Sequence, residues 1–141
     1  MKKILFAGLL LLAAAATQAQ CDKKIILTAS VTQYLGEDSS VQRSVDEATS
    51  IELDKNVMIL IPGSEEKKRT GTIESFTCNW STPFKDGITI VKTTLTNASG
   101  DARKMTITIE GKNGQITLHA VMDENPGRII RLRADKFEEK K

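Results

Sequence analysis

The chain has 141 residues, with 20 Lys and Arg against 18 Asp and Glu, and this length suits a single domain. Without residues 1–19, which hold two of the lysines, the formal charge is 18 − 18, or zero. A basic nucleic-acid-binding protein is therefore not expected. One His and two Cys are too few for an evident zinc or iron–sulfur site, so we expect no metal and no cofactor.

Residues 1–19 have the pattern of a cleaved signal peptide. Two lysines precede an apolar run over 4–16, which is short for a membrane span, and the small residues Thr17 and Ala19 suit a cleavage site. We therefore predict an exported protein, periplasmic or extracellular, without a transmembrane segment. The mature chain, 20–141, is then one β-domain.

Cys21 and Cys78 are the two cysteines of the chain. Because exported proteins meet oxidising compartments, we predict a disulfide between them. Closing so long a loop would contribute about 4 kcal/mol to stability in the chain-entropy model. A lipid anchor on Cys21 is a minor alternative, because Gln18 and Gln20 fit poorly beside the lipid-attachment sites of bacterial lipoproteins.

The composition of 20–141 favours strands. This segment contains 14 Thr, 13 Ile and 6 Val, and β-branched residues pack well on a pleated sheet. Alternation along 24–35 places Tyr34 on the face opposite a set of apolar residues: Ile25, Leu27, Ala29, Val31 and Leu35. Further strands are expected at 41–45, 49–53 and 57–61, with a bend at 46–47.

The second half of the chain alternates more clearly. Asn113-Gly114 between two alternating runs is a strong hairpin signal. We expect another turn at 125–127 and a frayed tail at 138–141. The strands expected here are 70–79, 88–96, 105–110, 116–122 and 130–134.

Eight or nine strands with short connections predict an all-β antiparallel meander. Closing it into an up-and-down barrel would remove both exposed edges, and a two-sheet β-sandwich is the alternative. With the signal peptide, this pattern resembles the small secreted lipocalin-like, or calycin-like, proteins of bacteria over 23–137. The lipocalin Gly-x-Trp is absent, because the only Trp is Trp80. The resemblance implies a closed barrel with a cavity for a small apolar molecule.

If the barrel carries a ligand, the candidate binding residues are Tyr34, Trp80 and Phe84. Trp80 and Phe84 flank one loop, whereas Tyr34 precedes another, so whether they share one barrel end stays open. The alternative for Trp80 is a core anchor of the barrel.

Basic residues concentrate along the last expected strand, with Arg128, Arg131, Arg133 and Lys136. Alternation with Ile130 and Leu132 points Arg131 and Arg133 outward, so we leave them out of the site. His119 is expected on the outer face of its strand for the same reason.

No residue is assigned as catalytic, and we do not expect an enzyme. Two kinds of function remain. The first is a carrier of a small apolar or amphipathic ligand. The second is a filled barrel whose outer surface binds a protein partner. Large inward side chains would favour the filled barrel: Ile107, Ile109, Leu118, Met122 and Leu132.

Overall fold

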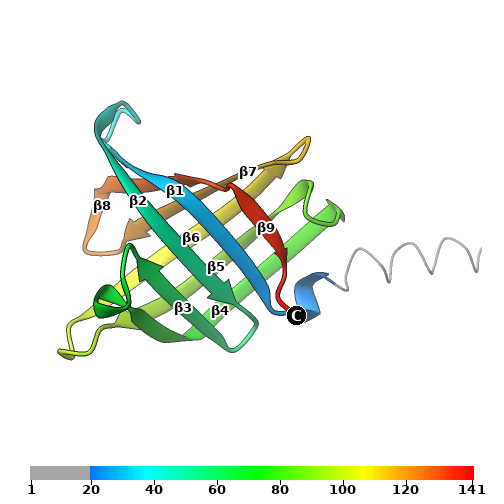
Figure 1. Ribbon diagram of the computed structural model, residues 1–141, viewed down its shortest axis with the longest axis horizontal. Helices are drawn as coiled ribbons and strands as arrows, with labels where there is room; N and C mark the ends of the chain where they lie inside the picture. The colour runs from blue at the N-terminus through cyan, green and yellow to red at the C-terminus, as the bar shows by residue number, and fades with distance from the viewer. Residues whose placement is uncertain (1–19) are drawn as a thin grey trace, which may run out of the picture.

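The computed structural model describes residues 20–141, and the signal-peptide prediction lies outside them. Nine strands occupy this part of the chain (Figure 1): β1 (Ile25–Leu35), β2 (Val41–Leu53), β3 (Val57–Pro62), β4 (Arg69–Thr82), β5 (Asp86–Thr96), β6 (Ala102–Lys112), β7 (Gln115–Met122), β8 (Asn125–Arg133) and β9 (Lys136–Glu139). Two short 3₁₀ turns, η1 (Gln20–Asp22) and η2 (Glu65–Lys67), complete it. No helix within 20–141 has the length and apolar character to cross a membrane.

The strands close into a barrel. Each of β1 to β8 pairs antiparallel with its sequence neighbour, and β8 pairs with β1 through Thr32–Leu35. This confirms the predicted all-β up-and-down barrel, and the β-sandwich alternative is wrong. The loops after β1, β3, β5 and β7 gather at one end, on the left in Figure 1. We call this end the mouth. The 3₁₀ turn η1 lies at the opposite end.

Three local predictions are wrong, all because pairing between strands overrides local turn preferences. The segments 41–45 and 49–53 are one strand, β2, rather than two, although the bend expected at 46–47 coincides with a shift in the β1–β2 register between Asp46 and Thr49. The turn expected at 125–127 lies earlier, because β8 already begins at Asn125. The tail is not frayed throughout: β9 pairs with the first part of β1, where Glu138 faces Ile26.

A bulge in the β1–β2 ladder changes which face of β1 points inward. The register shifts between Ala29 and Val31. A bulge of this kind reverses the alternation beyond it. Leu27 and Ala29 are buried as predicted, but beyond the bulge Thr32 is buried in place of Val31. Tyr34 follows Thr32 onto the inner face and faces the barrel cavity.

The end opposite the mouth is packed solid. Trp80 is 1% exposed, and its indole N–H donates to Thr89 Oγ1 at 2.8 Å. Phe137 of β9 covers the Trp80 ring, with 5.6 Å between ring centroids, and Phe84 packs edge-on against Phe137 at 5.1 Å. Trp80 is therefore a core anchor.

A disulfide joins Cys21 of η1 to Cys78 of β4, which confirms the predicted pair. It ties the segment before β1 to the barrel wall at this packed end. Gln20 adds a second connection across the same end, because its Oε1 accepts a hydrogen bond from the Phe84 backbone N–H.

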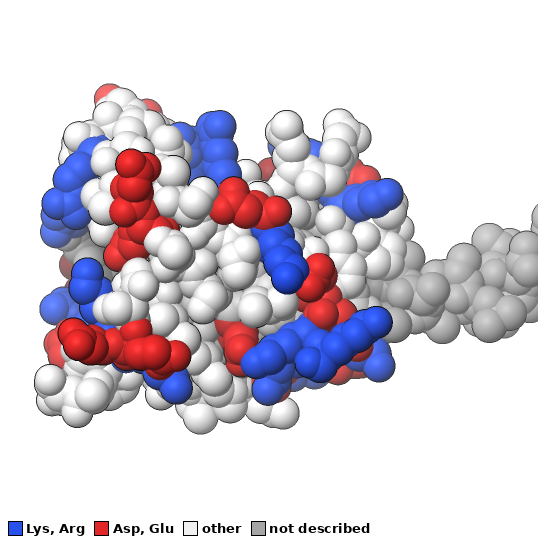
Figure 2. Space-filling model, viewed as in Figure 1, with Lys and Arg blue, Asp and Glu red and all other residues white. Residues whose placement is uncertain are grey.

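The outer surface carries both signs of charge. On the face shown in Figure 2, acidic and basic side chains are interspersed rather than gathered by sign. Ion pairs such as Lys140–Glu52 and Lys136–Glu138 contribute to this mixture. Exposed pairs of this kind add little to stability, so the fold depends on the buried interior.

Candidate functional site

The barrel encloses a cavity of about 390 Å³ that extends to the mouth. Its wall is mainly apolar and includes three methionines, Met58, Met105 and Met122. Thioether side chains are flexible and adapt to ligands of irregular shape. Four of the side chains expected to fill the barrel line this space without filling it: Ile107, Leu118, Met122 and Leu132.

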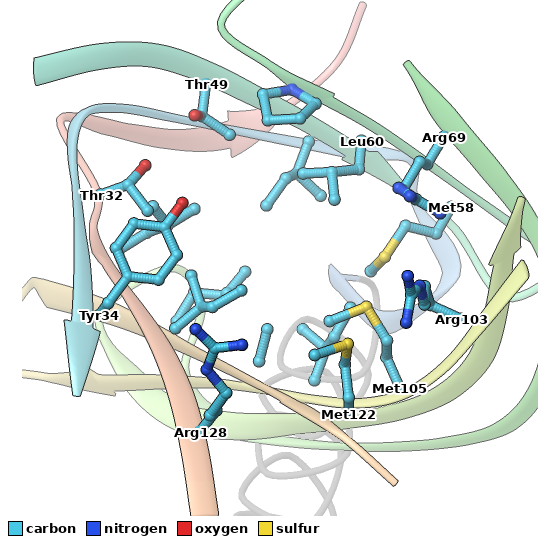
Figure 3. Close-up of a pocket in the computed structure, with 17 residues that line it drawn as sticks. Thr32, Tyr34, Thr49, Met58, Leu60, Arg69, Arg103, Met105, Met122 and Arg128 are labelled. Atoms are coloured by element: carbon cyan, nitrogen blue, oxygen red, sulfur yellow. The ribbon is translucent and has the colours of Figure 1, made fainter. Parts of the chain in front are cut away.

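Three arginines, Arg69, Arg103 and Arg128, line the cavity near its mouth (Figure 3). They stand near the start of β4, β6 and β8. Because the strands alternate in direction, these even-numbered strands all begin at the mouth. The inward face of each strand therefore brings its arginine to the same opening.

This convergence of arginines is not predicted from the sequence. From the sequence, Arg128 is expected only as part of the basic last strand and Arg69 only as part of the basic segment Lys67-Lys68-Arg69, and no role is expected for Arg103. A usable signal was present, because Arg103 is in phase with the buried residues Met105 and Ile107. Arg128 is likewise in phase with Leu132, which is buried. If the alternation of inward and outward residues is followed back to the start of β6 and β8, both arginines fall on the inward face.

Carboxylates neutralise two of the three arginines. Arg69 and Arg103 both contact Asp101 Oδ2, at 2.8 and 3.2 Å, and Arg103 also contacts Glu124 at 3.2 Å. Hydrogen bonds from Arg69 and then Arg103 hold the pKa of Asp101 below its usual value. Hydrogen bonds to Asp101 and Glu124 raise the pKa of Arg103. This cluster stabilises the loop before β6 and is electrically balanced.

Arg128 lies on the other side of the mouth, beside Tyr34. Both flank a side pocket of about 110 Å³ whose remaining wall is apolar, formed by Ala120, Met122 and Ile130. The guanidinium of Arg43 stacks on the Tyr34 ring, 4.4 Å from its centroid. This cation–π contact fixes the ring at the cavity edge.

Hydroxyl groups line the cavity wall beside Tyr34. Thr32 and Thr49 are both buried and both line the cavity. Thr32 Oγ1 donates to Glu47 Oε2 at 3.1 Å. Thr49 Oγ1 is the one buried side-chain oxygen or nitrogen in the described residues without a hydrogen-bond partner.

The structure separates the three ligand-binding candidates. Tyr34 lines the cavity near the mouth. Trp80 and Phe84 lie together at the packed end, connected through Phe137, and neither lines the cavity. The open question about the barrel ends is therefore answered: Tyr34 occupies one end and the other two residues occupy the opposite end.

Arg131, Arg133 and His119 lie on the outer face of β7 and β8, in a shallow polar groove with Glu110. The outward orientation predicted for the two arginines is correct. Arg131 donates to Gln33 Oε1 at 2.8 Å. Burial, and then the charge of Arg131, lower the pKa of His119, which favours the neutral imidazole.

The fold and the cavity define the class of this protein: a closed, eight-stranded up-and-down barrel with an internal cavity open to one end. Lipocalins share this architecture. Comparison of the sequence with protein-family models and with curated proteins gives no match. The cavity and its side chains are therefore the features that bear on function.

Proposed function

We propose that the protein is a lipocalin-like, non-enzymatic binding protein that carries a small amphipathic ligand inside its barrel. The observation behind this proposal is the cavity of about 390 Å³, with an apolar wall and a polar mouth. Small-molecule sites usually measure roughly 300–1,000 Å³ and combine an apolar lining with a few polar groups. The cavity fits the lower part of this range.

The placement of the reactive side chains also supports binding rather than catalysis. The one histidine of the sequence, His119, lies on the outer face of the barrel. Both cysteines are joined in the disulfide. The side chains around the cavity are aliphatic, thioether, hydroxyl and guanidinium groups, which suit recognition of a ligand with one polar end.

The disulfide fits an exported protein, because such bonds persist in oxidising compartments. A carrier located in the periplasm or outside the cell would meet amphipathic molecules that are poorly soluble in water. The alternative function, a protein-interaction module, is expected if large side chains fill the barrel. The cavity supports the carrier instead.

The test is binding of the neutral apolar fluorophore N-phenyl-1-naphthylamine, followed by its displacement with 1-dodecanol. We expect saturable binding of one fluorophore per protein. Ala120 lines the cavity and its side pocket, so Ala120→Phe should weaken binding by about tenfold or more through steric occupation.

The matched control is Val121→Phe, because Val121 is the next residue on β7 and faces the other side of the strand. This variant should bind the fluorophore like the wild type. Circular dichroism of both variants checks that the barrel is intact. Absence of saturable binding by the wild-type protein, or equal binding by folded Ala120→Phe, would overturn the carrier proposal.

A further inference from the structure

Three polar groups face the cavity without a protein partner. Thr49 Oγ1 has no hydrogen bond although it is buried. The hydroxyl of Tyr34 and the guanidinium of Arg128 line the same cavity, and neither takes part in a hydrogen bond or salt bridge within residues 20–141. Figure 3 shows all three on the side of the cavity opposite Arg69 and Arg103.

Of the three arginines that line the cavity, one has no ion pair within residues 20–141. Asp101 and Glu124 balance Arg69 and Arg103, whereas Arg128 has no such partner. A guanidinium binds a carboxylate with charge-assisted hydrogen bonds, and a phenol hydroxyl beside it can donate another. This combination suits the head group of an anionic amphiphile.

A carboxylate suits this pair of side chains. The two oxygens of a carboxylate accept two parallel hydrogen bonds from one guanidinium. Arg128 is the arginine of the cavity lining that has no ion pair within residues 20–141, and the Tyr34 hydroxyl can donate to the same group.

The unpaired hydroxyl of Thr49 indicates that the ligand carries a second polar group. Thr49 is 4% exposed, whereas Arg128 is exposed to solvent, so the Thr49 hydroxyl is shielded from water. A buried hydroxyl without a partner is unfavourable because it has lost its hydrogen bonds to water. An oxygen atom on the ligand chain would supply the missing partner.

We infer that the ligand is the anion of a hydroxylated fatty acid. Its carboxylate binds Arg128 and Tyr34 at the mouth, its chain lies along the apolar wall, and a hydroxyl on the chain bonds to Thr49 Oγ1. This inference rests on the proposed carrier function. It adds the chemical class of the ligand and its orientation in the barrel.

The experiment displaces bound N-phenyl-1-naphthylamine from the complete mature protein with four probes. These are 1-dodecanol, dodecanoate, 3-hydroxydodecanoate and 6-hydroxydodecanoate. We expect dodecanoate to bind about tenfold more tightly than dodecanol, because only the carboxylate forms charge-assisted bonds with Arg128. At least one hydroxy acid should bind several-fold more tightly than dodecanoate.

Two variants test which side chain causes each gain in affinity, that of dodecanoate over dodecanol and that of the hydroxy acid over dodecanoate. Arg128→Met keeps an unbranched side chain without charge, so it should abolish the preference for dodecanoate over dodecanol. Arg133→Met is the matched control, because Arg133 is on the same strand but on the outer face. Thr49→Val keeps the shape of the side chain. It should remove the preference for the hydroxy acid over dodecanoate.

The outcomes separate this inference from the carrier proposal. If neither the fluorophore nor dodecanol binds, the carrier proposal itself fails. If dodecanol binds as tightly as dodecanoate, or Arg128→Met keeps the preference, the carboxylate assignment is overturned and the carrier proposal stands. If no hydroxy acid exceeds dodecanoate, or Thr49→Val weakens both acids equally, the hydroxyl on the chain is overturned.

Discussion

Two buried threonines in the barrel, Thr49 and Thr93, differ in whether the hydroxyl group has a hydrogen-bond partner. Thr93 is fully buried, and its Oγ1 donates to the Thr72 carbonyl at 2.7 Å. Thr49 is buried to a similar degree, but its Oγ1 has no partner. A hydroxyl buried without a hydrogen bond costs about 1–3 kcal/mol, whereas a satisfied one contributes about 1 kcal/mol. The two sites should therefore respond in opposite ways to loss of the hydroxyl.

We predict that Thr49→Val raises the free energy of unfolding of the ligand-free protein by about 1 kcal/mol. Thr93→Val should lower it by about 1–2 kcal/mol, because the Thr72 carbonyl then loses its donor. Urea unfolding followed by circular dichroism measures both changes. A Thr49→Val protein less stable than the wild type would show that its hydroxyl is already satisfied.

At the scale of strands and turns, local chemistry predicted one connection in detail. Asn113 and Gly114 both have positive φ, 53° and 82°, as a two-residue hairpin turn requires. The bulge in the β1–β2 ladder, by contrast, has only a weak local signal: the polar Gln33 stands on the phase of Ala29 and Val31. Only the pairing of β1 with β2 shows where the inner face changes.

Packing between β4 and β6 gives a prediction about one glycine. A Cβ on Gly111 would lie 2.6 Å from the Trp80 ring and 2.7 Å from the Lys85 carbonyl. Because the Trp80 ring is buried and fixed, we expect Gly111→Ala to lower the free energy of unfolding by about 1–3 kcal/mol. Thermal and urea unfolding measure this effect.

The control for Gly111→Ala is a double-mutant cycle with Trp80→Phe, whose smaller ring leaves room for the new methyl group. The second substitution should recover part of the loss, so that the two effects are not additive. A fully additive cycle, or a Gly111→Ala protein as stable as the wild type, would contradict the steric account.

At the scale of the whole molecule, the disulfide links two residues separated by 57 positions. The chain-entropy model assigns about 4 kcal/mol to closing such a loop, a large part of the stability of a small domain. We predict that Cys21→Ser/Cys78→Ser lowers the free energy of unfolding by about 3–4 kcal/mol. Urea unfolding of this variant and of the reduced wild-type protein should agree. An unchanged midpoint would show that barrel packing alone holds this end.

By itself, the sequence determined the all-β class, the sites of several turns, the disulfide partners and the outward orientation of Arg131 and Arg133. These features depend on local alternation, on turn chemistry or on a pair of cysteines without competitors. Only the tertiary structure decided the closure of β8 onto β1, the docking of β9 and the inner position of Tyr34. Each depends on the register between segments far apart in the chain. The same long-range pairing brings Arg128 and Thr49 to one cavity, because strand direction and bulges set which side chains meet inside a closed barrel.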